Sequence, residues 1–293
     1  MVVAELTTSE TNFKYIDGRR YNNIEGLKYP LPNDYDELDR LHLQHFVIRH
    51  IFQSNFSAPV EHVLNRDGSK VLDVGCGTGS WAFDMATNYP KAEFIGVDIS
   101  PVQPYSIKPR NVSFINTDVL NGLPFEDNTF DYVFQRLMVI SIPRNFWPDH
   151  ISELTRVLKP GGYLELSEIG PPYELGPVSA KIRSAFEHFS EHKDIDFNVL
   201  CKLRSFVEQN GQFNDIHEVK NESFFSPETG KLGRAAIDNI KILFGNLIST
   251  LMPILDVTSE EYYEMVNSMC KELSDFNSYQ HIIRIYACKM ENN

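Results

Sequence analysis

One stretch, residues 71–81 with the sequence VLDVGCGTGSW, constrains the fold of this chain more than any other. The apolar run from Lys70 to Val74 predicts a buried parallel strand, and a helical pattern begins near Ser80. Three glycines lie between them at alternate positions: Gly75, Gly77 and Gly79. Glycine suits such a loop because the backbone takes angles that a side chain opposes, and because a ligand can approach the main chain closely. We therefore expect a strand, a tight loop and a helix, with the loop as the floor of a ligand site.

Two acidic residues indicate which ligand this floor receives. The next strand, Glu93 to Val97, is followed by Asp98, so a carboxylate lies beside the glycine loop at the same edge of the sheet. A carboxylate accepts hydrogen bonds, and the two hydroxyls of a ribose donate them. The glycines are spaced GxGxG rather than the GxGxxG of dinucleotide sites, and Asp73 precedes them, where it would oppose a phosphate and favour an ammonium group. These features favour a nucleoside that carries an amino acid.

The acidic residue followed by GxGxG resembles the first motif of the class I S-adenosylmethionine-dependent methyltransferases. The passage Leu-Lys-Pro-Gly-Gly at 158–162 is also typical of these enzymes and is not expected in a nicotinamide dehydrogenase. The resemblance implies a doubly wound, Rossmann-like α/β sheet of seven strands. It also implies S-adenosylmethionine as cofactor, held by Asp73, Gly75, Gly77, Thr78, Gly79, Asp98, Ile99, Thr117, Asp118, Val119 and Gln135. In this family the acid after the third strand accepts from the adenine amine; for Asp118 the alternative is a helix cap.

The first part of the chain resembles a narrower group, the fungal methyltransferases that include the secondary-metabolism regulator of the velvet complex. The matching motifs are Gly-Arg-Arg-Tyr at 18–21, Leu-Pro-Asn-Asp at 31–34, Glu-Leu-Asp-Arg-Leu at 37–41 and Gln-His at 44–45. The resemblance implies that Tyr29, Arg40 and His45 lie near the cofactor; the alternative is an edge helix without ligand contacts. Five residues are candidates for contact with substrate: Tyr29, His45, Arg136, Glu168 and Tyr173. We assign no catalytic base.

The rest of the chain predicts alternating strands and helices, and hence a parallel sheet with right-handed crossovers. We expect a mobile tail at 1–12, a helical leader at 13–66 and a methyltransferase domain at 67–293, with helical insertions at about 170–215 and 231–277 that form a lid. In the leader, Asn33 or Asp34 is expected to cap a helix whose apolar face includes Leu38, Leu41, Leu43, Phe46, Val47 and Phe52. Further strands are expected at 112–115, 132–134, 163–166, 217–225 and 281–289, and a chain break at 170–172.

Composition excludes several kinds of partner. The net charge is −13 and there is no basic run, so we expect no direct contact with nucleic acid. The four cysteines lack metal-ligand spacing, which predicts no metal site and fits a reducing compartment. The amino terminus has no long apolar core, so a secretory signal is not expected. Residues 237–255 predict one amphipathic covering helix rather than a membrane span, so we expect a cytoplasmic protein, with the nucleus as the alternative compartment.

Three functions remain open from the sequence. The leading hypothesis is a methyltransferase that acts on a small molecule. The second is a cofactor-binding regulator that works through protein partners, as the fungal resemblance allows. The third, a nicotinamide oxidoreductase, is suggested by the strand, glycine loop, helix and terminal acid alone.

Overall fold

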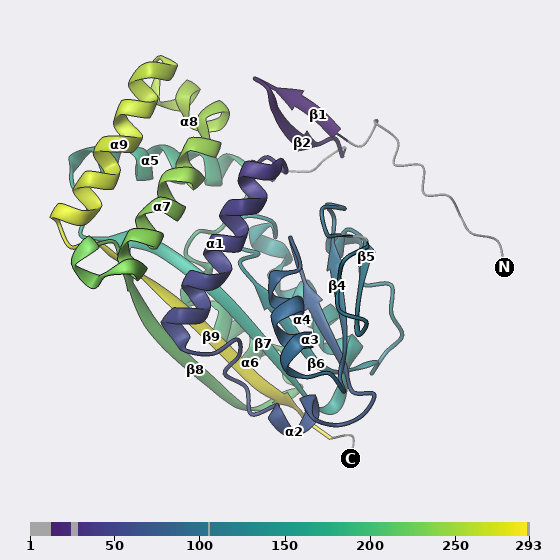
Figure 1. The fold of residues 1–293 in the computed structure, drawn as a ribbon. Helices are drawn as coiled ribbons and strands as arrows, with labels where there is room; N and C mark the ends of the chain where they lie inside the picture. Colours follow the sequence, from purple (N-terminus) through teal and green to yellow (C-terminus); the bar gives the residue numbers. More distant parts are fainter. Residues whose placement is uncertain (1–12, 25–28, 105, 292–293) are drawn as a thin grey trace.

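The computed structural model describes residues 13–24, 29–104 and 106–291; the tail expected at 1–12 lies outside them. Its main sheet has seven strands in the order β5-β4-β3-β6-β7-β9-β8 (Figure 1). The strands are β3 (Lys70–Val74), β4 (Glu93–Asp98), β5 (Val112–Asn116), β6 (Phe130–Arg136), β7 (Leu158–Tyr173), β8 (Phe213–Phe224) and β9 (Tyr279–Lys289). The first five are parallel, and β9 is antiparallel to both β7 and β8. The expected doubly wound sheet is therefore confirmed.

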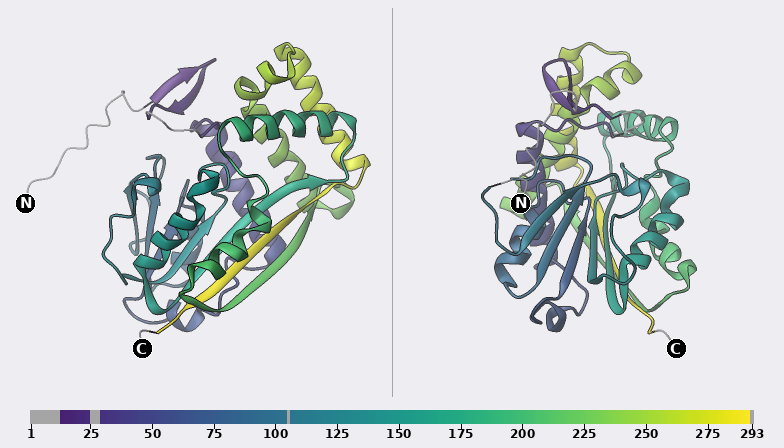
Figure 2. Two further views of the ribbon diagram at one scale, coloured as in Figure 1. Left: turned by 180° about the vertical axis from the view of Figure 1, so that it is seen from behind. Right: turned by 90° about the vertical axis from the view of Figure 1, so that its right-hand side faces the viewer.

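Helices cover both faces of the sheet, as the edge-on view in Figure 2 shows. On one face, α3 (Ser80–Asn88) packs Trp81 and Met85 against Val71 and Phe94 of β3 and β4. On the other, α4 (Trp147–Val157) and α6 (Leu203–Asn210) pack against Leu72 and the strands beside it. The short helices are α2 (Glu61–Leu64), η2 (Val119–Asn121), η3 (Arg144–Phe146), η4 (Val199–Cys201) and η5 (Pro227–Thr229). Because the central strands are buried on both faces, their apolar runs are continuous, which is why the sequence predicts them well.

The predicted chain break at 170–172 is wrong. β7 continues to Tyr173, with a shift in register between Ile169 and Pro172 where it pairs with β9. Pairing with β6 ends at Ser167, so beyond that point β7 has a neighbour on one side only. A proline, which has no N–H to donate, is tolerated at such an irregular, one-sided position. The expected strand at 163–166 is therefore the middle of a much longer one.

Four helices of the two insertions form a layer of their own, whereas α6, near the end of the first insertion, packs against the sheet. They comprise α5 (Pro177–His192), α7 (Lys231–Asn246), α8 (Ile248–Leu255) and α9 (Ser259–Asp275), at the upper left of Figure 1. Their shared core includes Phe186, Phe225, Leu251, Tyr262 and Val266. The single helix expected over 237–255 is wrong, because α7 ends at Asn246 and α8 begins at Ile248. Gly245 and Asn246 are weak helix formers. The side-chain amide of Asn246 donates a hydrogen bond to the Glu37 carboxylate of the leader at 2.6 Å.

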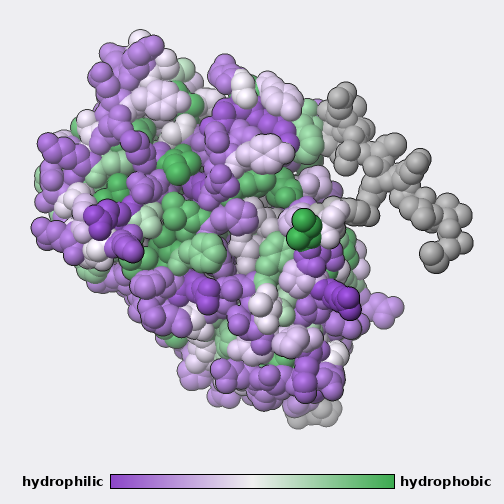
Figure 3. Space-filling model, in the orientation of Figure 1, coloured by the Kyte–Doolittle hydropathy of each residue, from purple (hydrophilic) through white to green (hydrophobic). Residues whose placement is uncertain are grey.

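The leader begins with a hairpin of β1 (Phe13–Ile16) and β2 (Arg19–Asn22), which was not predicted from the sequence. It continues into α1 (Tyr35–Phe52), which Asp34 caps by accepting a hydrogen bond from the Glu37 amide, as expected. The expected apolar face of α1 is wrong in part. Phe46 is 57% exposed, whereas the polar residues Glu37, Arg40 and His45 are buried. Figure 3 shows hydrophobic and hydrophilic residues side by side on the surface seen there.

Candidate active site

A cavity of about 310 Å³ lies over the carboxyl edge of the sheet. The glycine loop and the ends of β3, β4 and β6 form its floor, the leader forms one wall, and α5, α7 and α9 enclose the far end. The predicted residues that line it are Tyr29, Asp73, Gly75, Gly77, Thr78, Asp98, Ile99, Thr117, Asp118, Val119 and Arg136. Residues from three strands and from the leader, distant in sequence, therefore meet in one space.

The glycine loop has the backbone that the sequence predicts. Gly75 and Gly77 have φ values of 66° and 54°, in the left-handed region that side chains disfavour. The Gly77 amide donates to an Asp98 carboxylate oxygen at 2.8 Å, which fixes the loop against β4. Gly79 lies outside the cavity lining, at the start of α3. A Cβ at Gly79 would lie 2.5 Å from the ring of Phe114, so this glycine serves the packing of the helix onto the sheet.

Asp98 ends β4 with its carboxylate in the cavity. Besides Gly77, the backbone amide of Ser100 donates to it at 2.8 Å. Burial raises the pKa of Asp98, while these two amide donors oppose that shift. Each carboxylate oxygen can accept more than one hydrogen bond, so Asp98 retains acceptor capacity toward the cavity.

The segment after β5 supplies the neighbouring wall. The Thr117 amide donates to the Asp98 carbonyl at 2.9 Å, which joins the two strand ends. Asp118 caps η2 by accepting from the Leu120 amide at 3.0 Å, and it also lines the cavity together with Val119. Asp118 therefore caps η2 and still lines the cavity.

Asp73 and Arg136 are two charged lining residues whose pKa values are both shifted by burial. Asp73 is 4% exposed, and its Oδ2 atom has no hydrogen-bond partner. Burial raises the pKa of Asp73 to about 7, although Arg136 acts in the opposite direction. Burial lowers the pKa of Arg136 to about 10, although Asp73 favours its charged form. An acceptor without a partner at the floor of a cavity is suited to a ligand that brings a hydrogen-bond donor or a positive charge.

His45 lies behind Arg136 rather than in the cavity lining. Its Nδ1 accepts from Arg136 at 3.2 Å, and therefore its Nε2 carries the proton and donates to Asp84 at 3.3 Å. Burial lowers the pKa of His45 to about 3, so it is neutral at ordinary pH. The leader helix thus fixes the direction of the Arg136 side chain.

Three other predicted residues also lie outside the lining. Gln135, on the opposite side of β6 from Arg136, pairs with buried His150 at 2.5 Å. Glu168 is 1% exposed and accepts from the Met138 amide at 2.7 Å, and burial raises its pKa to about 8. Tyr173 is 37% exposed and stacks on Tyr279. The structure therefore does not bring these three side chains to the cavity.

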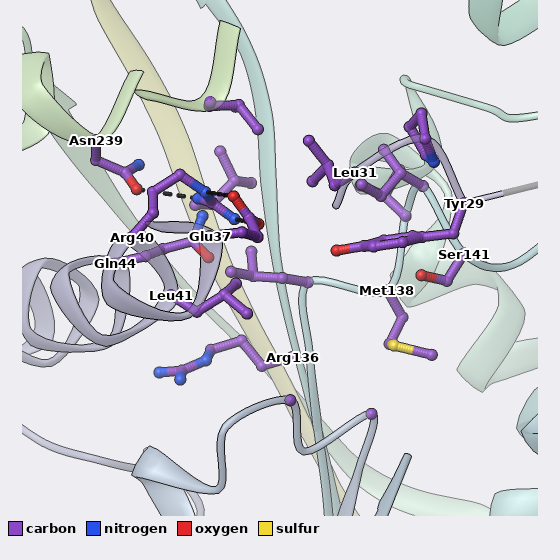
Figure 4. A pocket seen from close by; sticks show the side chains of 18 of the residues that line it. Tyr29, Leu31, Glu37, Arg40, Leu41, Gln44, Arg136, Met138, Ser141 and Asn239 are labelled. Atoms are coloured by element: carbon purple, nitrogen blue, oxygen red, sulfur yellow. Dashed lines mark hydrogen bonds and ion pairs between the residues drawn. The ribbon is translucent and has the colours of Figure 1, made fainter. Parts of the chain in front are cut away.

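A polar roof covers the cavity, and its side-chain pairing was not predicted from the sequence. Arg40 and Glu37, both buried in α1, form an ion pair of 2.6 Å, and Arg40 also donates to Asn239 of α7 at 3.0 Å (Figure 4). Tyr29 lies across the cavity from them with its hydroxyl directed inward. The sequence places Arg40 near the cofactor by resemblance, but no local pattern indicates a partner 199 residues away.

Neither a metal cluster nor a membrane span is found in the described part of the chain. No group of three or more His, Cys, Asp or Glu residues there could hold a metal ion. No described helix is both long enough and apolar enough to cross a membrane.

Comparisons with known proteins agree with this geometry. A family model described as a methyltransferase domain matches residues 71–162. Methyltransferase pytC of Aspergillus terreus is 39% identical over 165 residues, which cover 56% of this chain and 48% of the relative. The chain thus spans about half the length of this relative. The secondary metabolism regulator LAE1 of Hypocrea atroviridis is 30% identical over 274 residues, covering 87% of this chain and 76% of the regulator.

Among solved structures, the [4+2]-cyclase SpnF superposes with a TM-score of 0.51 at 16% identity. The match covers 89% of this chain and 97% of the cyclase. At this identity the likeness extends to the fold alone.

Proposed function

Because this chain belongs to the methyltransferase family that includes the secondary metabolism regulator LAE1, we propose that it transfers a methyl group from S-adenosylmethionine to a small molecule. Family membership confirms the expected class of fold and S-adenosylmethionine as its cofactor. The observation that carries the proposal is the unpartnered, buried Asp73 oxygen in a cavity that Asp98 also lines. An ammonium group and a ribose are the donors that these two acids can receive.

Each part of the cofactor has a proposed set of residues. The glycine loop approaches the cofactor with its main chain, and Asp98 accepts from the ribose hydroxyls. Thr117, Asp118 and Val119 border the adenine. Asp73 receives the ammonium group, and Arg136, on the same side of the floor, receives the carboxylate of the amino acid.

The reaction needs positioning more than covalent help. When bound, S-adenosylmethionine would supply the methyl group: a lone pair on the acceptor would bond to the methyl carbon, the electrons of the sulfur–carbon bond would return to sulfur, and a hydroxyl or amine acceptor would release its proton to solvent. The enzyme contributes by holding donor and acceptor in line within an enclosed cavity.

Calorimetric titration with S-adenosylhomocysteine tests the cofactor assignment. We expect Asp98→Ala to weaken binding by about tenfold or more, because hydrogen bonds to a charged group are lost. Asp67→Ala is the matched control, because Asp67 is 85% exposed and does not line the cavity. Equal affinity of wild type and Asp98→Ala for S-adenosylhomocysteine would show that Asp98 does not bind the cofactor.

The acceptor is sought by incubating the purified protein with isotope-labelled methyl donor and a low-mass extract of the source cells. The name of LAE1 motivates a second function, a cofactor-binding regulator that acts through protein partners. Labelled products formed by the purified chain alone support the enzyme. Cofactor binding with turnover only after a protein partner is added supports the regulator.

A further inference from the structure

The cavity continues beyond the glycine loop into a chamber enclosed by the inserted helices. We define this acceptor chamber by Ile140, Phe186, Leu243, Phe244, Leu247 and Met269, which come from the segment after β6 and from α5, α7, α9 and the α7–α8 junction. Their side chains are aliphatic, aromatic or thioether groups. An apolar ligand placed against them is favoured because binding removes apolar surface from water.

The charged side chains at the border of the chamber are paired with one another. Arg40 and Glu37 are 2% and 1% exposed and lie 2.6 Å apart. Arg183 and Glu187 of α5 form a second pair at 2.8 Å. Among the described lining residues, the remaining charges belong to the proposed cofactor site: Asp73, Asp98, Asp118 and Arg136. A charged acceptor in the chamber would therefore lose its hydration without gaining a counter-ion, which is costly.

Tyr29 supplies a polar group between the floor and the chamber. Its hydroxyl is directed into the cavity in Figure 4, and burial raises the pKa of Tyr29 so that it stays protonated. A protonated hydroxyl donates a hydrogen bond to a neutral oxygen or nitrogen without adding charge. Tyr29 is thus suited to hold the polar end of a mainly apolar molecule beside the cofactor.

We propose that the acceptor chamber binds an uncharged, largely apolar small molecule, and that it discriminates against anions of the same shape. The inference rests on the proposed function, because it places this molecule beside the cofactor as the methyl acceptor. It follows from the apolar lining, the buried Arg40–Glu37 pair, the more exposed Arg183–Glu187 pair on α5, and the enclosure by α5, α7 and α9.

Two fluorescent probes with the same ring system test this proposal: the neutral N-phenyl-1-naphthylamine and the anionic 8-anilinonaphthalene-1-sulfonate. Both become brighter in apolar sites. With the cofactor site saturated by S-adenosylhomocysteine, we expect the neutral probe to bind at least about tenfold more tightly. Equal or tighter binding of the sulfonate would overturn the proposal.

Variants on α7 locate the probe. Leu243→Glu places a charge in the chamber and is expected to abolish binding of the neutral probe, while leaving S-adenosylhomocysteine affinity within about twofold. Ile242→Glu is the matched control, because Ile242 is 36% exposed and does not line the cavity. Leu243→Trp, which fills the chamber without adding charge, is expected to reduce binding of the neutral probe too.

The outcomes separate the two proposals. If S-adenosylhomocysteine binds and the neutral probe does not, the chamber assignment fails and the proposed function stands. Unchanged probe binding in both Leu243 variants also overturns the assignment. If S-adenosylhomocysteine does not bind to the wild-type chain, the proposed function itself fails.

Discussion

At the scale of single residues, the buried carboxyl of Asp73 lowers the free energy of unfolding of the ligand-free chain at neutral pH. A carboxyl buried without a partner for one of its oxygens is more easily kept neutral, hence its raised pKa of about 7. An ordinary aspartate ionises near pH 4 in the unfolded chain. The folded chain therefore holds this proton up to a higher pH, and its free energy of unfolding falls between about pH 4 and pH 7. A cofactor with an ammonium group would restore the missing partner.

The first prediction is that cofactor affinity depends on pH through Asp73. We expect S-adenosylhomocysteine to bind about fifteenfold more tightly at pH 7 than at pH 5.5, because the ionised fraction of a group with a pKa near 7 rises by that amount. Affinity should fall again at alkaline pH, where the ammonium group of the ligand loses its proton. Calorimetric titration across this range measures both limbs.

Asp73→Asn separates this carboxyl from other titrating groups. The variant should bind the cofactor more weakly at neutral pH and lose the acid limb of the profile. Without ligand, it should be more stable to urea than wild type at pH 7.5, because the asparagine has no charge to bury. An unchanged acid limb in Asp73→Asn would assign the titration to another residue.

At the scale of elements, α1 is an internal wall rather than a simple edge helix. Its buried face carries the Arg40–Glu37 ion pair. Two side chains of α7 bind this pair: Asn239 accepts from Arg40, and Asn246 donates to Glu37. Buried ion pairs add little net stability, but each member depends on the other. The leader and the second insertion are therefore joined by a polar network that requires all of its members.

The second prediction concerns this pair. Arg40→Met should lower the free energy of unfolding by about 3–5 kcal/mol, because Glu37 stays buried without its counter-ion. The double variant Glu37→Leu with Arg40→Met should recover part of that loss, since no uncompensated charge remains. Arg204→Met, in the exposed pair Arg204–Glu208, is the control and should change stability by less than about 0.5 kcal/mol. Urea unfolding measures all three, and equal losses in the single and double variants would contradict the mechanism.

At the scale of the whole molecule, the strands of the sheet can be predicted from the sequence, whereas the contacts between α1 and α7 above the cavity cannot. The runs at 70–74 and 93–97 are apolar because neighbours cover both faces, so each strand is evident from its own residues. The hairpin at 13–22 has a local signal that could have been used, Asp17-Gly18, where both residues take positive φ.

The contacts between α1 and α7 have no such local pattern in the sequence. Arg40 of α1 donates to Asn239 of α7, which lies 199 residues away in the sequence. The partners of a polar side chain depend on how insertions fold over the sheet edge. The floor of the site could thus be predicted from the sequence, whereas its lid required the structure.

The third prediction concerns how the leader is held to that lid. Arg19 of β2 donates to Asp34 at 2.5 and 2.8 Å, and to Asn246 at the end of α7 at 2.7 Å. One side chain therefore joins the hairpin, the cap of α1 and the second insertion. Its side chain is 26% exposed, so the loss of global stability in Arg19→Ala should be modest, below about 1.5 kcal/mol.

The effect of Arg19→Ala should instead appear in the rate at which the cavity opens. We expect S-adenosylhomocysteine to dissociate several-fold faster in stopped-flow experiments, with faster hydrogen exchange at the amides of 19–22, because a local opening no longer breaks these three hydrogen bonds. Arg204→Ala, which removes an arginine from an exposed pair on α6, should leave both rates unchanged. If Arg19→Ala accelerates exchange without altering dissociation, the hairpin opens independently of the cofactor site, and retention of the cofactor then depends on α1 and α7.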